Sequence, residues 1–214
     1  MHTWAIVPVK PLGAAKSRLS KVLQPAERAD LARHFLEHTL AALSACRGVD
    51  ETLVISADPL AWKLAAQYGA QCYCEADTPG LNTSLRRAAS RAVSRGANAI
   101  LIVPTDLPLL NETHLQQVIE SVNQAPAVTL APDRHRKGTN IMLQSPPNVI
   151  PFSYGIGSFQ THLKNARTAG AAISVLEIPE LALDIDSPAD LKKADLVWLR
   201  NTLPQPYRNV KTLR

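Results

Sequence analysis

The chain has 214 residues, of which 46% are hydrophobic and only 19% are charged, and it carries a net charge of +5 with a pI of about 9.3. This composition argues against an intrinsically disordered protein, apart from the tail, and no apolar run approaches the roughly 20 residues that a membrane-spanning helix needs. The positive charge suits an anionic small molecule or a nucleic acid. Aromatic residues make up only 5% and are not interleaved with the basic clusters, which argues against nucleic-acid binding by stacking.

Three cysteines, Cys46, Cys72 and Cys74, occur along the chain. The first residues contain neither the charged nor the apolar region of a secretory signal. We therefore expect a protein of the reducing cytoplasm, where thiols stay free. Cys72 and Cys74 lack a second pair of metal-binding residues, so we interpret them as strand residues that face one side rather than as zinc ligands.

Strand and helix patterns alternate along the chain. Strands are predicted at residues 3–9, 52–56, 71–75, 98–103, 127–131, 139–143 and 173–178. Helices are predicted from Pro25 through the apolar positions that end at Leu43, at residues 59–68, 81–95, 111–123 and 157–169, and from Pro188 to about Asn201. This alternation predicts an α/β fold: one domain, residues 1–201, has a mostly parallel sheet with helices on both faces, and a polar tail, residues 202–214, follows it. In such sheets ligands bind at the carboxyl ends of the strands.

The loop after the first strand is basic. It contains Lys10, Lys16 and Arg18 but only one glycine, Gly13, so it is neither a G-x-G-x-x-G motif nor a P-loop. Positive charge and free backbone N–H groups nevertheless suit the phosphates of a nucleotide. The alternative is a solvated basic loop without a ligand.

Gly80 and Asn82 open the helix predicted at residues 81–95. An asparagine amide carries both a donor and an acceptor, so Asn82 could read a base edge or a ribose. The alternative is an ordinary helix start that Asn82 caps.

Aspartates stand where apolar runs end. Asp106 follows a predicted buried strand in the sequence Pro-Thr-Asp-Leu-Pro, and Asp184 and Asp186 form an Asp-x-Asp pair. Because side chains alternate along an extended segment, the paired carboxylates point to one side. Three carboxylates suit Mg²⁺, which in turn binds substrate phosphates. Taken singly, Asp106 could instead form a turn before Pro108, and the pair could cap the last helix from a distance.

A second anion site is predicted ahead of the helix at residues 157–169. Gly155 and Gly157 allow close backbone approach, and Ser158 stands where the helix presents its positive end. The alternative is a glycine turn with Ser158 as the helix cap. We interpret His162, one turn into the helix, as a surface or capping residue rather than a base.

These features occur in a fixed order: residues 8–10 (Pro-Val-Lys), 15–19 (Ala-Lys-Ser-Arg-Leu), 80–82 (Gly-Leu-Asn), 104–109 (Pro-Thr-Asp-Leu-Pro-Leu), 138–140 (Gly-Thr-Asn), 155–159 (Gly-Ile-Gly-Ser-Phe) and 184–191 (Asp-Ile-Asp-Ser-Pro-Ala-Asp-Leu). From residue 4 to about residue 195 the sequence resembles the 2-phospho-L-lactate guanylyltransferase family (CofC, called FbiD in actinobacteria), which serves coenzyme F-420 biosynthesis. The resemblance implies a single-domain, Rossmann-like nucleotidyltransferase fold similar to that of the molybdopterin guanylyltransferases.

The resemblance also implies an activity. GMP would pass from GTP to a phosphorylated three-carbon acid (2-phospho-L-lactate, phosphoenolpyruvate or 3-phosphoglycerate) with Mg²⁺ present, pyrophosphate would leave, and the product would go to the next enzyme of the coenzyme F-420 pathway. A homodimer is left open, and neither nucleic acid nor membrane is an expected partner. The implied site residues are Asp106, Asp184 and Asp186 for the metal; Thr139, Gly155 and Ser158 for the acid; Pro8, Lys10, Lys16, Arg18, Gly80 and Asn82 for GTP; and Asp106, Lys16 and Arg18 for catalysis.

Two departures from the family pattern are visible. The family often has Pro-Ala-Asp where residues 104–106 read Pro-Thr-Asp, and Phe-Gly-Pro-Gly-Ser where residues 154–158 read Tyr-Gly-Ile-Gly-Ser. The second departure touches the acid site and leaves open which acid is bound. Two other readings remain: a related nucleotidyltransferase with a molybdopterin or sugar phosphate as acceptor, and a regulatory nucleotide-binding protein without turnover. The three intact aspartates argue against the second.

Overall fold

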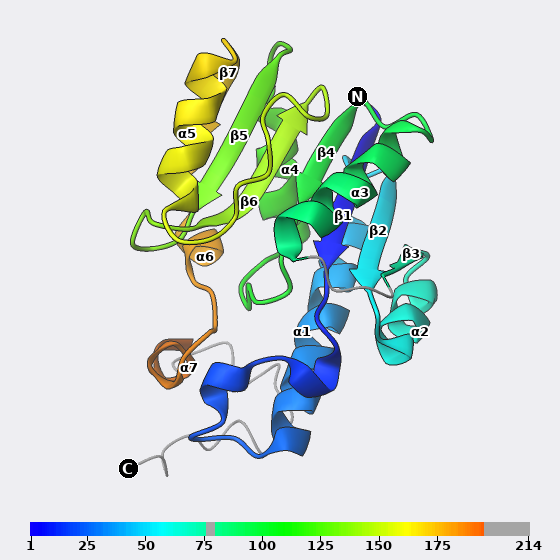
Figure 1. Cartoon of the computed structure of the whole chain (residues 1–214), viewed down its shortest axis with the longest axis vertical. Helices are drawn as coiled ribbons and strands as arrows, with labels where there is room; N and C mark the ends of the chain where they lie inside the picture. The colour runs from blue at the N-terminus through cyan, green and yellow to red at the C-terminus, as the bar shows by residue number, and fades with distance from the viewer. Residues whose placement is uncertain (76–79, 195–214) are drawn as a thin grey trace.

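The structure, a computed structural model of the chain, describes residues 1–75 and 80–194. Seven strands of this part form one sheet in the order β3-β2-β1-β4-β6-β5-β7, and only β6 runs antiparallel to its neighbours (Figure 1). The strands are β1 (Thr3–Pro8), β2 (Glu51–Ser56), β3 (Gln71–Cys74), β4 (Ala99–Ile102), β5 (Ala127–Pro132), β6 (Thr139–Ser145) and β7 (Ala172–Val175).

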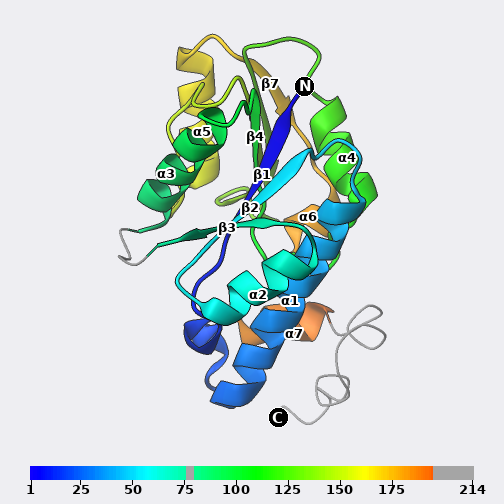
Figure 2. The same cartoon turned by 90° about the vertical axis from the view of Figure 1, so that its right-hand side faces the viewer.

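Helices cover both faces of the sheet. Figure 2 shows α3 and α5 on one face and α1, α2 and α4 on the other. The helices are α1 (Pro25–Ala45), α2 (Pro59–Gln67), α3 (Leu81–Val93), α4 (Glu112–Glu120), α5 (Ser158–Thr168), α6 (Pro179–Ala182) and α7 (Pro188–Ala194), and two short 3-10 helices, η1 (Leu12–Ala14) and η2 (Ser17–Leu19), lie in the loop after β1.

The central strand β1 explains the two-sided core. Trp4 and Ile6 pack against the α3 and α5 side, whereas Ala5 and Val7 pack against the α1 side, because successive side chains of a strand point to opposite faces. All four are buried. A strand that is covered on both faces is apolar throughout, which is why its sequence shows a continuous hydrophobic run rather than an alternating one.

A third, smaller apolar cluster lies beyond the sheet edge. Leu19 of η2, Leu31 and Phe35 of α1, Ile185, and Leu191 of α7 pack together with almost no exposed surface. The cluster joins the loop after β1 to the segment that carries Asp184 and Asp186, although these segments are more than 160 residues apart in sequence. It therefore sets the position of functional side chains on both segments.

The α/β fold with a mostly parallel sheet and helices on both faces is confirmed. The antiparallel direction of β6, which pairs with β5 as a hairpin, was not predicted. Several predicted boundaries were wrong. The strand predicted at residues 173–178 spans Ala172–Val175, and the unpredicted helix α6, which Pro179 opens, follows it. The helices predicted to reach residues 95 and 123 end at Val93 and Glu120. The predicted end of the last helix near Asn201 and the tail at residues 202–214 lie outside the described residues.

Ile185→Ala should lower the free energy of unfolding by about 2–5 kcal/mol, since it empties a fully buried position in the third cluster. Urea unfolding followed by circular dichroism measures this. Ile156→Ala is the matched control, because the Ile156 side chain is fully exposed and its loss should change stability by less than about 0.5 kcal/mol. Equal midpoints for the two variants would contradict the assigned role of the cluster.

Candidate active site

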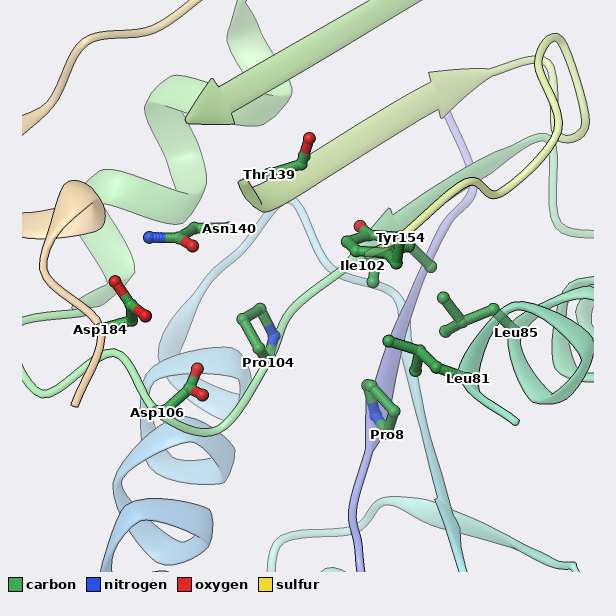
Figure 3. A pocket seen from close by; sticks show the side chains of 10 residues that line it. All are labelled: Pro8, Leu81, Leu85, Ile102, Pro104, Asp106, Thr139, Asn140, Tyr154 and Asp184. Carbon is green, nitrogen blue, oxygen red and sulfur yellow. The ribbon is translucent and has the colours of Figure 1, made fainter. Parts of the chain in front are cut away.

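A cavity of about 130 Å³ opens at the carboxyl ends of β1 and β4. The reversed direction of β6 matters here, because it brings the first residues of that strand, Thr139 and Asn140, to the same edge of the sheet. In Figure 3 Asp106 and Asp184 lie at one end of the cavity and Leu81 and Leu85 at the other. The lining residues are Pro8, Leu81, Leu85, Ile102, Pro104, Asp106, Thr139, Asn140, Tyr154 and Asp184.

The carboxylates of the predicted metal site come from two segments that are held together by backbone. The Ile185 N–H donates to the Asp106 carbonyl oxygen at 3.0 Å. Because the Ile185 side chain is buried in the third cluster, the flanking Asp184 and Asp186 face away from it. Burial, and after it the nearby negative charge of Asp106, raise the pKa of Asp184 to about 6. The cavity therefore holds negative charge that the protein itself does not fully neutralise.

Lys16 reaches into this junction. Its ammonium lies 2.7 Å from the Ile185 carbonyl oxygen, 3.4 Å from Asp106 Oδ2 and 3.6 Å from Asp186 Oδ1. It also lies 5.4 Å from the centre of the Phe35 ring. Only 8% of the side chain is exposed. Lys16 thus connects the loop after β1, the turn after β4 and the Asp-x-Asp segment through a single charge.

The three predicted cations of the first loop have different surroundings. Lys16 points inward, whereas Lys10 is exposed just beyond the end of β1. Arg18 lies 3.2 Å from Asp186 Oδ2, with 76% of its side chain exposed. Arg18 and Lys10 are accordingly accessible to a large anion outside the cavity, while Lys16 is already committed to carboxylates.

Asn82 joins α3 to the segment before α5. Its Nδ2 donates to the Tyr154 carbonyl oxygen at 3.0 Å, and its Oδ1 accepts from the Tyr154 N–H at 2.7 Å. The amide therefore has both groups occupied by backbone, and its predicted contact with GTP stays a prediction. Gly80 immediately precedes α3 as its N-terminal cap residue. The Tyr154 hydroxyl is buried without a hydrogen-bond partner in the described residues, and burial raises its pKa.

The predicted acid-binding residues form a hydrogen-bonded group. The Thr139 N–H donates to Ser158 Oγ at 3.0 Å, and Thr139 Oγ1 lies 2.9 Å from Nδ1 of His162. Gly155 has a φ of +139°, a backbone conformation that residues with a Cβ adopt only with strain. A Cβ built at this position would meet no atom within 4 Å. The space over Gly155 is thus open to a ligand. His162 is fully buried, so its interpretation as a surface or capping residue was wrong.

Asp190 and Arg134 support the Asp-x-Asp segment from behind. Asp190 Oδ2 accepts from the Asp186 N–H, the Ser187 N–H and the Ser187 hydroxyl, and its Oδ1 pairs with the Arg134 guanidinium. Burial opposes ionisation of Asp190, but the contacts with Arg134 and Ser187 outweigh it and lower its pKa. Asp190 rather than Asp184 or Asp186 therefore interacts with the start of α7, which removes the alternative role considered for the pair.

Sequence reasoning missed several residues of the site. Asn140, Tyr154 and Pro104 line the cavity, and Asn140 Nδ2 also donates to the Leu181 carbonyl oxygen of α6 at 2.8 Å. The available signal for Asn140 was its place beside Thr139 in the Gly-Thr-Asn run. Tyr154 gave no such signal, because its position depends on the Asn82 contact.

No group of three or more histidine, cysteine, aspartate or glutamate side chains within residues 1–75 and 80–194 is arranged to hold a metal ion. The three-aspartate metal site therefore stays a prediction. No helix in the same ranges is long and apolar enough to cross a membrane.

Solved structures share the fold. A candidate nucleotide-diphospho-sugar transferase from Desulfovibrio desulfuricans superposes with a TM-score of 0.74 at 18% identity, covering 95% of this chain and 92% of the other. The CMP:2-keto-3-deoxy-manno-octonic acid synthetase in complex with CTP gives a TM-score of 0.60 at 14% identity, over 91% and 97% of the two chains. The chain therefore has the α/β fold of the nucleotidyltransferases, with the cavity at the strand ends where such sheets bind ligands.

The sequence comparisons define the family. The family described as "Guanylyl transferase CofC like" matches residues 3–197, so the chain belongs to the CofC guanylyltransferase family. A phosphoenolpyruvate guanylyltransferase of Rubrobacter xylanophilus is 40% identical over 91% of this chain and 94% of its own. A 3-phospho-D-glycerate guanylyltransferase of Colwellia psychrerythraea is 31% identical over 90% of each chain. A 2-phospho-L-lactate guanylyltransferase of Methanothermobacter thermautotrophicus is 32% identical over 89% and 83%.

Asp184→Asn should stabilise the metal-free protein by on the order of 1–2 kcal/mol at pH 7. The substitution removes a carboxylate whose ionised form is disfavoured in the folded state by burial and by the charge of Asp106. Between about pH 6 and pH 3.8, Asp184 is protonated in the folded protein but still ionised in the unfolded chain. The wild type therefore regains stability as the pH falls through 6. The advantage of the variant should shrink over the same interval.

Urea unfolding with a chelator present, at pH 7.5 and pH 4.5, measures this difference. Asp30→Asn on the exposed surface of α1 is the matched control and should shift the midpoint little at either pH. A midpoint of Asp184→Asn equal to that of the wild type at pH 7.5 would rule out an unfavourable charge at this position.

Proposed function

We propose that the enzyme transfers GMP from GTP to the phosphate of a small phosphorylated three-carbon acid and releases pyrophosphate. The observation that carries this proposal is the cavity itself, which Asp106, Thr139 and Asp184 from three separate segments line. Relatives that align along most of their length with this chain are named as guanylyltransferases of such acids. The product would then serve coenzyme F-420 biosynthesis in the cytoplasm.

Among the candidate acids, phosphoenolpyruvate is the first to test. Relatives at 40% and 38% identity carry that name, whereas those named for 3-phospho-D-glycerate and 2-phospho-L-lactate are 31% and 32% identical. All three acids combine a carboxylate with a phosphate on a three-carbon skeleton. A small cavity with backbone N–H groups and hydroxyls beside a cation suits that shape.

Mg²⁺ fits part of the predicted ligand set. Asp106 and Asp184 offer hard oxygens that face the same cavity, and the raised pKa of Asp184 marks charge that a cation would offset. Asp186 is occupied by Lys16 and Arg18. Mg²⁺ ordinarily takes one or two carboxylates and completes its shell with water and substrate phosphates. We therefore propose Asp106 and Asp184 as the principal ligands, with Asp186 joining them when its cationic partners turn to phosphate.

The proposed chemistry needs no general base. A phosphate oxygen of the acid forms a bond to the α-phosphorus of GTP, the bond from that phosphorus to the bridging oxygen breaks, and pyrophosphate departs with the bonding pair. The attacking oxygen is already anionic, so the barrier lies in bringing two anions together in line. Mg²⁺ would supply charge neutralisation of the phosphates.

The basic residues of the first loop complete this proposal. In this proposal Arg18 and Lys10, both exposed, attract the triphosphate, and Lys16 and Arg18 stabilise charge on the departing pyrophosphate next to the carboxylates. Gly80 and Asn82 stand at the start of α3 on the same side of the cavity as Pro8 and Leu81, where we propose that the guanosine lies.

The wild-type protein, incubated with GTP, MgCl₂ and phosphoenolpyruvate, 3-phosphoglycerate or 2-phospho-L-lactate in turn, should give a guanylylated acid and an equal amount of pyrophosphate. Mass spectrometry detects the first and a coupled phosphate assay the second. Asp106→Asn should lower the rate by at least about 10²-fold, since it removes a proposed ligand of the Mg²⁺ that would neutralise the phosphates. Folded wild-type protein that releases no pyrophosphate with any of the three acids would refute the proposal.

Lys16→Ala should lower kcat/KM for GTP by about 10² or more, because Lys16 is a buried charge that we propose to stabilise the departing pyrophosphate. Lys164→Ala is the matched control: it removes an exposed lysine of α5 and should change the rate less than two-fold or so. Steady-state kinetics at saturating acid separates the two. Equal loss in both variants would show that only overall charge matters.

A further inference from the structure

His162 has both ring nitrogens engaged inside the protein. Its Nε2 lies 3.0 Å from the Ser153 backbone nitrogen, and its Nδ1 lies 2.9 Å from Thr139 Oγ1. A backbone N–H can only donate, so Nε2 must be the unprotonated acceptor. The hydrogen of the neutral ring therefore sits on Nδ1, and Nδ1 donates to the Thr139 hydroxyl oxygen.

The ring is held in this neutral tautomer by its surroundings. His162 is fully buried, and burial lowers its pKa to about 4. The Tyr154 ring packs against it edge to face, with 5.1 Å between ring centres. His162 is accordingly neutral throughout the physiological range and does not act as a general base.

The tautomer has a consequence for Thr139. A hydroxyl ordinarily rotates and serves as donor or acceptor according to its partner. Here the oxygen already accepts from His162, and the described residues offer no second partner for it, so its own hydrogen is left to donate. Thr139 lines the cavity, and its backbone N–H is fixed by Ser158 Oγ. Its hydroxyl is thus an oriented donor on a residue that lines the cavity together with Asp106 and Asp184.

We propose that His162 is a positioning residue for the acceptor: it fixes the Thr139 hydroxyl as a hydrogen-bond donor to an anionic oxygen of the phosphorylated acid. This inference rests on the proposed function and assigns its acid site a residue that touches no substrate. A donor hydroxyl selects an anionic oxygen, and it repels the N–H groups of other ligands, because two donors cannot pair. Because the rotation of the hydroxyl is already fixed, binding of the acid carries no further entropic cost for ordering it.

Two substitutions at His162 separate the two hydrogen bonds. In His162→Asn the amide nitrogen stands near the former Nδ1 and keeps a donor for Thr139, while the acceptor for Ser153 is lost. In His162→Gln the longer side chain reaches the former Nε2 and keeps an acceptor for Ser153, while the donor to Thr139 is lost. Both replace a buried ring by an amide, so their costs in packing are similar.

The measurements are KM for phosphoenolpyruvate, KM for GTP, kcat and the unfolding temperature of each variant. We expect His162→Gln to raise KM for the acid about ten-fold or more with KM for GTP within about two-fold, and His162→Asn to stay near the wild type. Thr139→Val should match His162→Gln, Thr139→Ser should retain acid binding, and adding His162→Gln to Thr139→Val should cause no further loss. The inference would be overturned if, in either amide variant, KM rose for both the acid and GTP in step with a fall in the unfolding temperature.

A measurement independent of turnover completes the test. The ¹⁵N chemical shifts of the His162 ring in the folded wild-type protein should show a protonated Nδ1 and an unprotonated Nε2 at pH 7. The opposite tautomer would refute the inference even if the enzyme is active. Absence of product from the wild type with every acid would instead refute the proposed function, so the two failures are distinct.

Discussion

The ammonium of Lys16 is the contact on which the rest of the site depends. It lies among the Asp106 carboxylate, the Asp186 carboxylate and the Ile185 carbonyl, and so holds three segments that no sheet hydrogen bond joins. A buried charge of this kind persists only when it is paired and hydrogen-bonded. The third apolar cluster, whose members Ile185 and Phe35 both contact the lysine, supplies that protected environment. Packing and charge at this junction therefore cannot be separated.

Reversal of one strand gives the cavity its two kinds of wall. A fully parallel sheet would present only carboxyl ends at this edge, with loops that lead into helices. Since β6 is antiparallel, its first residues stand beside the last residues of β4, and strand backbone forms one wall of the site. Asn82 then links that wall to α3 through its paired hydrogen bonds with Tyr154. The proposed nucleotide side and the proposed acid side are thus parts of one connected framework.

The sequence predicted the regular parts of this framework and failed where long-range contacts decide. Continuous apolar runs such as β1 and the proline-marked start of α1 depend on local pattern, and both were identified. The direction of β6 was not, because a hairpin and a crossover strand carry similar apolar patterns. The place of Asp106 at the site could be predicted from its position after β4. Asp184 follows α6 rather than a strand, and its nearness to Asp106 depends on the hydrogen bond from the Ile185 N–H to the Asp106 carbonyl oxygen. The pairing of Asp186 with cations and the burial of His162 could not, since both arise from segments distant in sequence.

The unbalanced negative charge around Asp184 has a bearing on the order of events. A phosphorylated acid carries charge of the same sign as Asp106 and Asp184, and in a small space of low dielectric such repulsion is substantial. A cation held by these carboxylates would relieve the repulsion, so the acid would bind more tightly after the cation has entered. Entry of the cation first would keep an abundant anionic metabolite from occupying the enzyme unproductively.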